Sequence, residues 1–592
     1  MRRQSRFLVR LRVRARRSWR SATRQFLARG ISSEWIMLSL AALIGAGAGF
    51  IVVGFYRLVD MMRHMLGWAS ESVGSVAGLS AFVVLPLALA AAHWLRTRAR
   101  QEPGGEMVPV LIRRYAKKGG ELPLNEMAYK LLSSVVTLGG GGSLGAEGPV
   151  AVAGASVGSG LGQLFRYSAT RRRVLLACGT AAGISAAYNA PIAGVLFALE
   201  VVAGTFAVSS LSPVVVASVM GAVVSRAFLG AQPAFAVPTE FLFVSAAELP
   251  LYLLLGLSAG ALAALFVKVF YGTQDLLARF VGEGVGSALV AGLLLASLGL
   301  ISPELLGDGR HGISLILSSQ IAGGIALSLG LLKILASGLT MGGGGSGGVF
   351  TPSLFVGAAF GSFFGLTAQA LFPGMNITPE AYALVGMAAL VAGGTFAPLT
   401  AIIIIFEMTD DYGLILPLML VCVVSYLVSR RLGRESLYSE ALVRLGEQIS
   451  HGADRSVLEG VSVAECYNRD PLVVLEDAPL RQVLAQLKGS RQTEFPVISR
   501  EFELEGMLSY QQISRALDDG GLLDLLIVAD LAGPILETVT PDDSLLDAMN
   551  RMGLRDIDFV PVVERRESRR LLGLLSRSDI MEAYRTNLLL QD

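Results

Sequence analysis

The chain repeats a glycine-rich segment inside apolar sequence. Residues 139–149 read GGGGSLGAEGP, and residues 342–352, about two hundred positions later, read GGGGSGGVFTP. Apolar segments that glycine and proline interrupt at corresponding places in two halves are typical of transporters, whose broken helices direct positively polarised N-termini at a bound ion. The repeat therefore predicts an anion pathway built largely from main-chain N–H groups. Each copy is followed by a matched Ala-Pro pair and glutamate: Ala190-Pro191 with Glu200, and Ala397-Pro398 with Glu407.

The composition is that of a membrane protein. Of the 592 residues, 53% are hydrophobic and only 16% are charged, and the mean hydropathy is +0.58, far from the average of soluble proteins. Glycine-broken pieces near 148–164, 181–202, 348–371 and 381–407 predict tilted and re-entrant helices, because irregular backbone at membrane depth must be buried in protein or line a cavity. Runs long enough, or nearly long enough, to span a membrane are 36–59, 79–92, 209–227, 251–271, 285–300, 321–335 and 415–428.

Basic residues predict the orientation in the membrane. The first 29 residues hold eleven arginines, and excess positive charge marks the cytoplasmic side. Residues 229–248 and 372–382 contain no Lys or Arg and suit the opposite face. No cleavable secretory signal is recognisable, so we expect the N-terminus to lie inside. The arginine-rich arm could also suit nucleic acid or targeting, but anchoring beside a hydrophobic span explains it more simply, and we expect no nucleic-acid partner.

The sequence gives little support for a metal site or for catalytic activity. The three cysteines and four histidines show no ligand spacing, so we expect neither a metal site nor a disulfide framework. The sequence contains no recognisable nucleophile, metal cluster or phosphate loop. We therefore expect a protein that is not an enzyme.

The composition changes after Tyr438. Residues 439–460 are polar and predict a linker. From about Val461, short β-branched runs alternate with amphipathic helical patterns, and the order recurs: EFPVIS and LEGMLSYQQISRAL are matched by IDFVPVVER and LLGLLSRSDIMEAY. The pattern predicts a soluble α/β tandem at the end of the chain.

Five motifs together resemble one family. They are GAEGP at 145–149, AAYNAPIAG at 186–194, GGVFTP at 347–352, APLTAIIIIFEMTDDY at 397–412 and SLYSEAL at 436–442. With them the chain resembles the CLC chloride channel and transporter family, with a C-terminal pair of cystathionine-β-synthase-type (CBS) domains. The resemblance implies a polytopic α-helical membrane protein with the inverted-repeat CLC fold, re-entrant broken helices and a C-terminal α/β CBS tandem. It also implies a homodimer in the lipid bilayer with one pore per subunit and with N- and C-termini in the cytoplasm.

The same resemblance divides the chain. Residues 1–30 form an arginine-rich cytoplasmic arm, 31–438 the transmembrane domain, 439–460 a linker and 461–592 the CBS pair. The two inverted halves cover about 31–230 and 248–438.

The family pattern also assigns roles to individual residues. Glu147 matches the gating glutamate, whose carboxylate mimics an anion and swings away when protonated or displaced; otherwise it is a helix N-terminal glutamate stabilised by the dipole. Tyr438 matches a tyrosine whose hydroxyl donates to the anion, and its alternative is an interfacial tyrosine. Lys130 adds a diffuse positive potential or simply snorkels. The implied main-chain donors are Gly145, Ala146, Gly148, Val349 and Phe350.

Two positions depart from the family pattern. Glu106 stands where a serine commonly donates to the anion, unless the local register is shifted. An ionised carboxylate about 4 Å from chloride would repel it by roughly 4 kcal/mol at an effective dielectric of about 20, so Glu106 must be protonated or turned away when the site is filled. Val201 stands where proton-coupled members typically carry a glutamate. We therefore hypothesise that Glu106 replaces that glutamate and exchanges protons with Glu147.

The C-terminal tandem offers one candidate nucleotide site. Ser576 and Asp579 fit the pattern that clasps an adenosine ribose, whereas the first copy has Gln512 in place of the acid. The tandem is either a dimerising scaffold or a regulatory site for ATP, ADP or AMP, and no cofactor is required.

The predicted function is transmembrane transport of chloride or a similar small anion, by channel or by proton-coupled exchange. Fluoride and nitrate are the alternative substrates. A CBS-containing magnesium channel is a remoter alternative, because its pore would need several carboxylates.

Overall fold

The long apolar runs form long helices in the computed structural model. Six of the seven predicted spans lie within helices, and the seventh, 321–335, is helical from Gly323 onward; the helices are α2 (Ser33–Met65), α3 (Val76–Arg96), α9 (Val208–Leu229), α10 (Leu249–Val281), α11 (Val285–Ile301), α13 (Gly323–Gly342) and α17 (Ile415–Leu432). The structure describes residues 33–66, 76–99, 106–206, 208–230, 248–321, 323–375, 377–409, 411–447, 458, 461–487, 492–510, 512–514, 526–555, 557–564 and 569–590. The arginine-rich arm therefore lies outside the described residues.

The chain divides into two units, Met1–Ile449 and Ser450–Asp592. Among the described residues of the first, six helices are long and apolar enough to cross a membrane. One of these six is α14 (Phe350–Leu371). The remaining elements of the unit are α4 (Val108–Lys117), α5 (Leu124–Gly139), α6 (Glu147–Phe165), α7 (Ala169–Tyr188), α8 (Pro191–Leu196), the π-helix η1 (Phe197–Ala203), the 3-10 turns η3 (Pro303–Leu305) and η4 (Tyr412–Leu414), α12 (Arg310–Leu317), α15 (Pro379–Thr395), α16 (Pro398–Thr409) and α18 (Leu437–Arg444).

The helix breaks occur at matched places in the two halves. α7 ends at Asn189 and α15 ends at Phe396, and both residues adopt left-handed backbone with φ of 57° and 58°. An alanine and then a proline follow each of them, and a residue before proline is disfavoured in a helix whereas proline suits the first helical position. The next helices, α8 and α16, therefore begin at Pro191 and Pro398.

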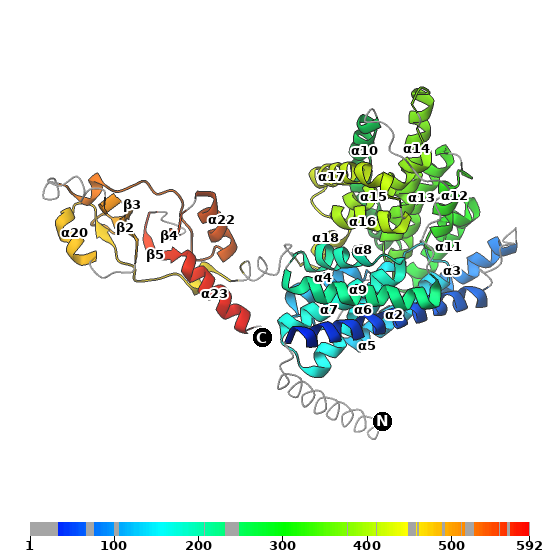
Figure 1. Ribbon diagram of the computed structural model, residues 1–592, viewed down its shortest axis with the longest axis horizontal. Helices are drawn as coiled ribbons and strands as arrows, with labels where there is room; N and C mark the ends of the chain where they lie inside the picture. The colour runs from blue at the N-terminus through cyan, green and yellow to red at the C-terminus, as the bar shows by residue number, and fades with distance from the viewer. Residues whose placement is uncertain are drawn as a thin grey trace, which may run out of the picture. The chain divides into compact units, whose positions relative to one another are not determined.

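Glycine brings the broken helices close together. A Cβ atom on Gly154 of α6 would overlap the carbonyl of Gly179 on α7, and one on Gly357 of α14 would overlap the carbonyl of Gly386 on α15. Only glycine permits such an approach. The helices of the first half, blue to green-cyan, and those of the second, green to yellow, gather in largely separate parts of the unit (Figure 1).

Each half caps a helix of the other. The carboxylate of Glu407, on α16, accepts hydrogen bonds from the amides of Ile192 (3.0 Å) and Ala193 (2.7 Å) at the start of α8. The carboxylate of Glu200, on η1, accepts from the amides of Leu399 (3.1 Å) and Thr400 (2.7 Å) at the start of α16. These carboxylates satisfy N–H groups that have no partner inside their own helices.

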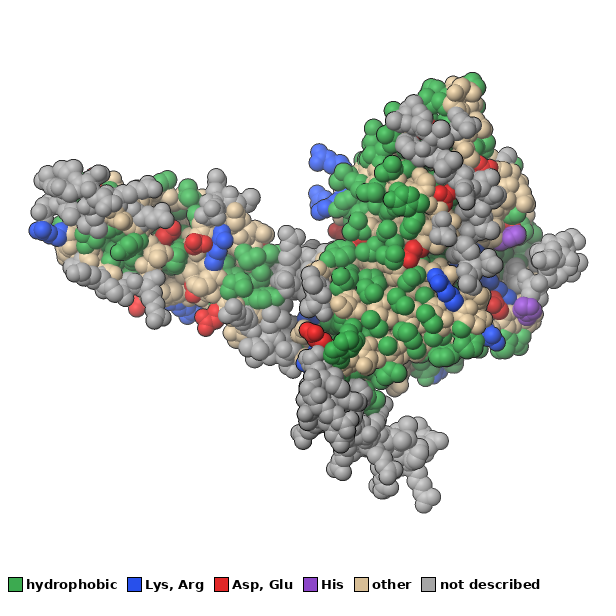
Figure 2. Space-filling view, viewed as in Figure 1, with side chains coloured by type: hydrophobic (Ala, Val, Ile, Leu, Met, Phe, Trp, Pro, Cys, Tyr) green, Lys and Arg blue, Asp and Glu red, His purple; other side chains and the backbone are tan. Residues whose placement is uncertain are grey.

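The surface of the first unit suits a lipid environment. Hydrophobic side chains cover most of its described surface on the face drawn in Figure 2. On α9 and α17, large apolar residues are exposed about every fourth position: Leu211, Val215, Val219, Val223, Leu416, Met419, Val423 and Leu427. The first unit is thus an integral multi-pass membrane domain.

The expected linker at 439–460 begins with helix instead of coil. α18 runs through Leu437–Arg444, and the side chains of Ser436 and Ser439 cap its start reciprocally. Arg444, its last residue, binds Glu440 on the same helix and Asp275 on α10. Residues 439–444 therefore belong to the membrane unit, and residues 448–457, 459 and 460 lie outside the described residues.

The second unit is the predicted α/β tandem. Its elements are η5 (Val463–Glu465), β1 (Val474–Leu475), α20 (Leu480–Leu487), β2 (Glu494–Ile498), β3 (Leu504–Ser509), η6 (Val528–Asp530), α22 (Leu545–Arg555), β4 (Phe559–Val563), β5 (Leu571–Ser576) and α23 (Arg577–Leu590). β2 pairs with β3 and β4 with β5, both antiparallel, and β1 pairs parallel with β2.

Candidate anion pathway

Three helix N-termini meet at one junction inside the membrane unit. Glu106 forms a parallel bridge with Gly347, and Gly145 forms an antiparallel bridge with Gly348. α4, α6 and α14 each begin within three residues of these bridges. Helix N-termini present N–H groups and positive dipole ends. The glycine-rich repeat thus builds an anion-attracting junction without a full cationic charge.

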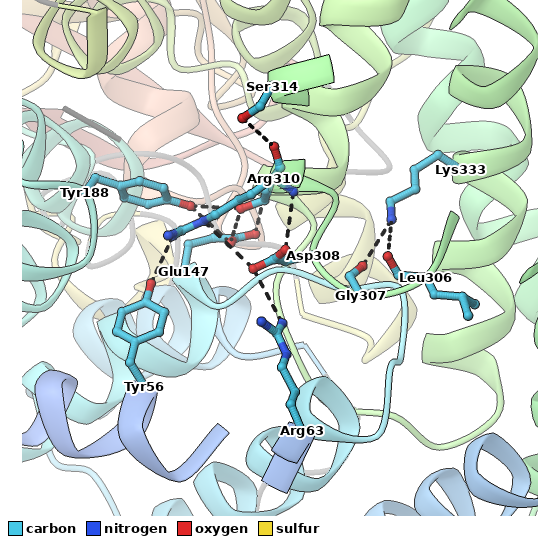
Figure 3. Close-up of polar contacts among 11 residues, drawn as sticks. Tyr56, Arg63, Glu147, Tyr188, Leu306, Gly307, Asp308, Arg310, Ser314 and Lys333 are labelled. Atoms are coloured by element: carbon cyan, nitrogen blue, oxygen red, sulfur yellow. Dashed lines mark hydrogen bonds and ion pairs between the residues drawn. The ribbon is translucent and has the colours of Figure 1, made fainter. Parts of the chain in front are cut away.

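The carboxylate of Glu147 occupies this junction and stands in for an anion. Its Oε1 accepts hydrogen bonds from the amides of Phe350 (2.5 Å) and Thr351 (3.1 Å). Its Oε2 accepts from the hydroxyls of Thr351 (3.0 Å) and Tyr188 (3.2 Å). The side chain is buried, and Figure 3 shows it beside Tyr188. Four donors therefore converge on the Glu147 carboxylate, and two of them are main-chain amides at the start of α14.

The predicted donors divide into three groups. The amide of Phe350 donates to the Glu147 carboxylate, and its role toward a free anion stays a prediction. The amide of Gly145 donates to the carbonyl of Gly348 at 2.8 Å, and its role as an anion donor also stays a prediction. Ala146, Gly148 and Val349 are buried at the same junction, and their role as anion donors stays a prediction.

Thr351 and Tyr188 were missed by the sequence reasoning. Thr351 carries a recognisable signal, because it lies in the first turn of α14, where an unpaired amide and a hydroxyl can serve one ligand. The sequence signal for Tyr188 is limited to its position in the AAYNAP motif, directly before Asn189, whose backbone is left-handed.

Tyr438 places a hydroxyl in the buried interior. The residue is 3% exposed, and its hydroxyl has no hydrogen-bond partner within the described part of the chain. Buried hydroxyls nearly always have a partner. The position therefore suits a hydroxyl that donates to a bound ion.

Glu106 lies in a polar cluster with Tyr271. The Tyr271 hydroxyl is 2.9 and 3.0 Å from the two oxygens of Glu106 and 2.6 Å from the carbonyl of Leu437. A hydroxyl has one hydrogen and cannot donate to all of these acceptors. Arg444 stacks on the Tyr271 ring at 4.6 Å. We call Glu106, Tyr271, Arg444 and Asp275 the Glu106 cluster.

Ser576 and Asp579 lie together at the start of a helix, and their role in nucleotide binding stays a prediction. The amide of Ser576 donates to Asp579 (2.9 Å), and the amide of Asp579 donates to the Ser576 hydroxyl (3.1 Å), so the pair caps the start of α23. Gln512 and Ser509 form the same exchange in the first copy. A cavity of about 240 Å³ opens at this first copy, lined by Ser509, Gln512, Glu494 and Glu537 among others. Burial and the neighbouring Asp558 carboxylate raise the pKa of Glu494.

Comparisons with known proteins agree with this architecture. A family model described as voltage gated chloride channel matches residues 87–430, and CBS domain models match 463–519 and 528–586. The chain therefore belongs to the voltage gated chloride channel (CLC) family.

Similar proteins include transporters of known name. A putative chloride channel protein ClcB-like from Ralstonia nicotianae is 34% identical over 428 residues, 69% of this chain and 97% of the relative. The H(+)/Cl(-) exchange transporter ClcA of Salmonella gallinarum is 33% identical over 465 residues, 76% and 97% of the two chains.

Two solved structures share the fold. The crystal structure of a slow cyanobacterial Cl⁻/H⁺ antiporter has a TM-score of 0.63 and 27% identity, over 69% of this chain and 97% of that chain. A eukaryotic CLC transporter has a TM-score of 0.62 over 93% of this chain and 99% of that chain, and its 21% identity supports the fold alone.

Proposed function

We propose that the protein carries chloride across a membrane through a pore gated by Glu147. The observation that carries the proposal is the Glu147 carboxylate, which is held by the amides of Phe350 and Thr351 as a chloride ion would be. The Tyr438 hydroxyl supplies a further buried donor. Donors of partial charge suit transport, because an ion must bind well enough to enter and weakly enough to leave.

Opening follows from competition for the same donors. An ionised Glu147 accepts from amides and hydroxyls, and a protonated one loses much of that attraction because it no longer carries the negative charge. Protonation, or an arriving anion, therefore releases the side chain. This coupling of proton to anion fits the exchange activity named for the Salmonella relative.

We propose that Glu106 is the second proton carrier. The Tyr271 hydroxyl has one hydrogen, and its nearest acceptor is the Leu437 carbonyl at 2.6 Å. When Tyr271 donates to that carbonyl, a protonated Glu106 can donate its own hydrogen to the Tyr271 oxygen, 2.9 Å away. Val201, in the buried η1 helix, offers no titratable group. Among the described residues that form the bridges and helix starts of the junction, the carboxyls are those of Glu106 and Glu147.

The orientation, assembly and regulation are further proposals. The arginine-rich arm favours cytoplasmic termini, and the exposed apolar faces of α9 and α17 suit lipid or a second subunit of a homodimer. The CBS pair is proposed to bind an adenine nucleotide. The acidic lining of its cavity favours a nucleoside or AMP over ATP, because Glu494 and Glu537 repel phosphates. Calorimetric titration with the three nucleotides checks this order.

The test of the function uses purified protein in chloride-loaded liposomes. Chloride efflux and external pH are followed together while the membrane potential is clamped. Proton movement that reverses with the chloride gradient indicates exchange, and efflux without it indicates a channel or an uncoupled carrier. Replacing chloride by fluoride or nitrate ranks the anions. Wild-type protein that moves none of them would refute the proposal.

A further inference from the structure

A second polar cavity lies beside the gate. It has a volume of about 470 Å³, and we call it the Arg310 vestibule. Its lining comes from α2, α7, α9 and the start of α12, which distant parts of the chain supply. The polar and charged lining residues are Tyr56, Asp60, Arg63, Tyr188, Asn189, Ser225, Asp308, Arg310 and His311.

One aromatic ring separates the vestibule from the gate. The hydroxyl of Tyr188 donates to Glu147 and lies 3.0 Å from the Thr351 hydroxyl. The guanidinium of Arg310 lies over the ring of the same tyrosine, 5.4 Å from its centroid. Figure 3 shows Arg310, Tyr188 and Glu147 converging from three different elements. An ion in the vestibule is therefore adjacent to the blocked junction.

Arg310 keeps most of its hydrogen-bonding capacity for a ligand. Among the described residues its guanidinium donates one hydrogen bond, to the Tyr56 hydroxyl at 3.1 Å. Its ion pair with Asp308 is long, at 3.9 Å, and Asp308 is shared with Arg63 at 3.7 Å. Charge-assisted hydrogen bonds measure about 2.7–2.9 Å, so neither arginine is saturated. The side chain of Arg310 is 31% exposed, which leaves it accessible.

The position of Arg310 is fixed by the chain before it. Lys333 is fully buried on α13, and its ammonium nitrogen lies 3.0–3.4 Å from the carbonyl oxygens of residues 304–307, to which its three hydrogens are directed. This holds the loop that leads into Asp308 and Arg310. The remaining titratable lining groups, Asp60 and His311, are exposed, and His311 lies 3.8 Å from Glu304. The guanidinium is thus preorganised, which lowers the cost of binding.

We propose that the Arg310 vestibule is an additional binding site for a small monovalent anion, which loads the junction when Glu147 leaves it. The inference rests on the proposed function, in which that anion is chloride. Arg310 holds the ion, and the Tyr188 hydroxyl, 3.0 Å from the Thr351 hydroxyl, connects the vestibule to the donors of α14.

The test measures chloride dependence from each side of a planar bilayer in turn. In Arg310→Gln the half-saturating chloride concentration should rise about tenfold on one side, and the rate at saturating chloride should stay within about twofold of wild type. Arg310→Lys keeps the charge, so its half-saturating chloride concentration should lie between those of wild type and Arg310→Gln. Arg57→Gln is the matched control, because Arg57 is exposed on α2 next to Tyr56 and does not line the cavity.

An unchanged half-saturating concentration in Arg310→Gln, or a loss equal at all chloride concentrations, would overturn the inference. A wild-type protein that moves no chloride would instead refute the proposed function, so the two failures are distinct. If Arg310→Gln does not fold, the wild-type protein crystallised in bromide decides the question. Anomalous scattering beside Arg310 supports the site, and bromide confined to the junction with Phe350 and Tyr438 overturns it.

Discussion

The Arg310 vestibule and the Glu106 cluster are built on the same repeated scaffold. Phe55-Tyr56 on α2 and Phe270-Tyr271 on α10 each begin the pattern FYxxxD, which ends at Asp60 and Asp275. An acid stands two residues before each following short helix, Asp308 before α12 and Glu106 before α4. A buried lysine, Lys130 or Lys333, stands nine residues before each GGGGS segment.

The two regions use this scaffold with opposite chemistry. In the Glu106 cluster, Arg444 is neutralised by Asp275 at 2.5 Å and Glu440 at 2.9 Å, which leaves the carboxyl beside Tyr271. In the vestibule, the equivalent Asp60 has no ion pair with Arg310 in the described residues, and the tyrosine binds a guanidinium. Under the two proposals, the vestibule therefore attracts an anion, and the Glu106 cluster presents a group that can carry a proton.

The gate shared by both regions should give the largest effect. Replacing Glu147 with Gln removes the titratable carboxylate and mimics its neutral form, so proton movement should fall to background while chloride flux continues. Parallel pH and chloride electrodes on liposomes measure both. Glu283→Gln, which removes an exposed acid, is the control. Persistent proton exchange in Glu147→Gln would show that the gate lies elsewhere.

The Glu106 cluster should show the next effect. Glu106→Gln keeps the size and polarity of the side chain but cannot exchange a proton, so the protons moved per chloride should fall about tenfold or more, a loss typical of a missing proton-transfer group. Glu440→Gln is the control. It removes a carboxylate that pairs with Arg444 of the cluster and leaves the Glu106 carboxyl in place, so proton coupling should be retained. Equal coupling in Glu106→Gln and wild type would remove Glu106 from the proton route.

The buried lysine of the vestibule side, Lys333, is expected to stabilise the loop before Arg310. Lys333→Met should destabilise the protein by about 2–3 kcal/mol, because an ammonium that serves several carbonyls is lost and the loop before Arg310 is released. Fluorescence-detected gel filtration after heating measures the loss in detergent. A melting temperature equal to that of wild type would mean that the loop is held without Lys333.

The sequence predicts the scaffold better than the contacts. Hydropathy and the glycine-proline repeat locate the spans and the breaks, because those are local properties of the chain. The contact of Tyr271 with Glu106 joins residues 165 positions apart, and the contact of Arg310 with Tyr56 joins residues 254 apart. Such pairings depend on how helices pack in three dimensions. The FYxxxD repeat at 55–60 and 270–275 is a local sequence signal for both tyrosines.

The smallest expected effect concerns Glu200 and Glu407, whose carboxylates cap helices of the opposite half. It allows the stability of the two halves to be compared. Glu407→Gln weakens two hydrogen bonds from amides at a helix N-terminus, and Glu200→Gln weakens two such bonds and one from the Thr400 hydroxyl, so each should cost about 1 kcal/mol. Near-equal shifts in thermal stability, with proton coupling retained in both, would mean that the repeat uses these glutamates structurally. A loss of coupling in Glu200→Gln alone would assign the proton route to the half that carries Val201 and would weaken the case for Glu106.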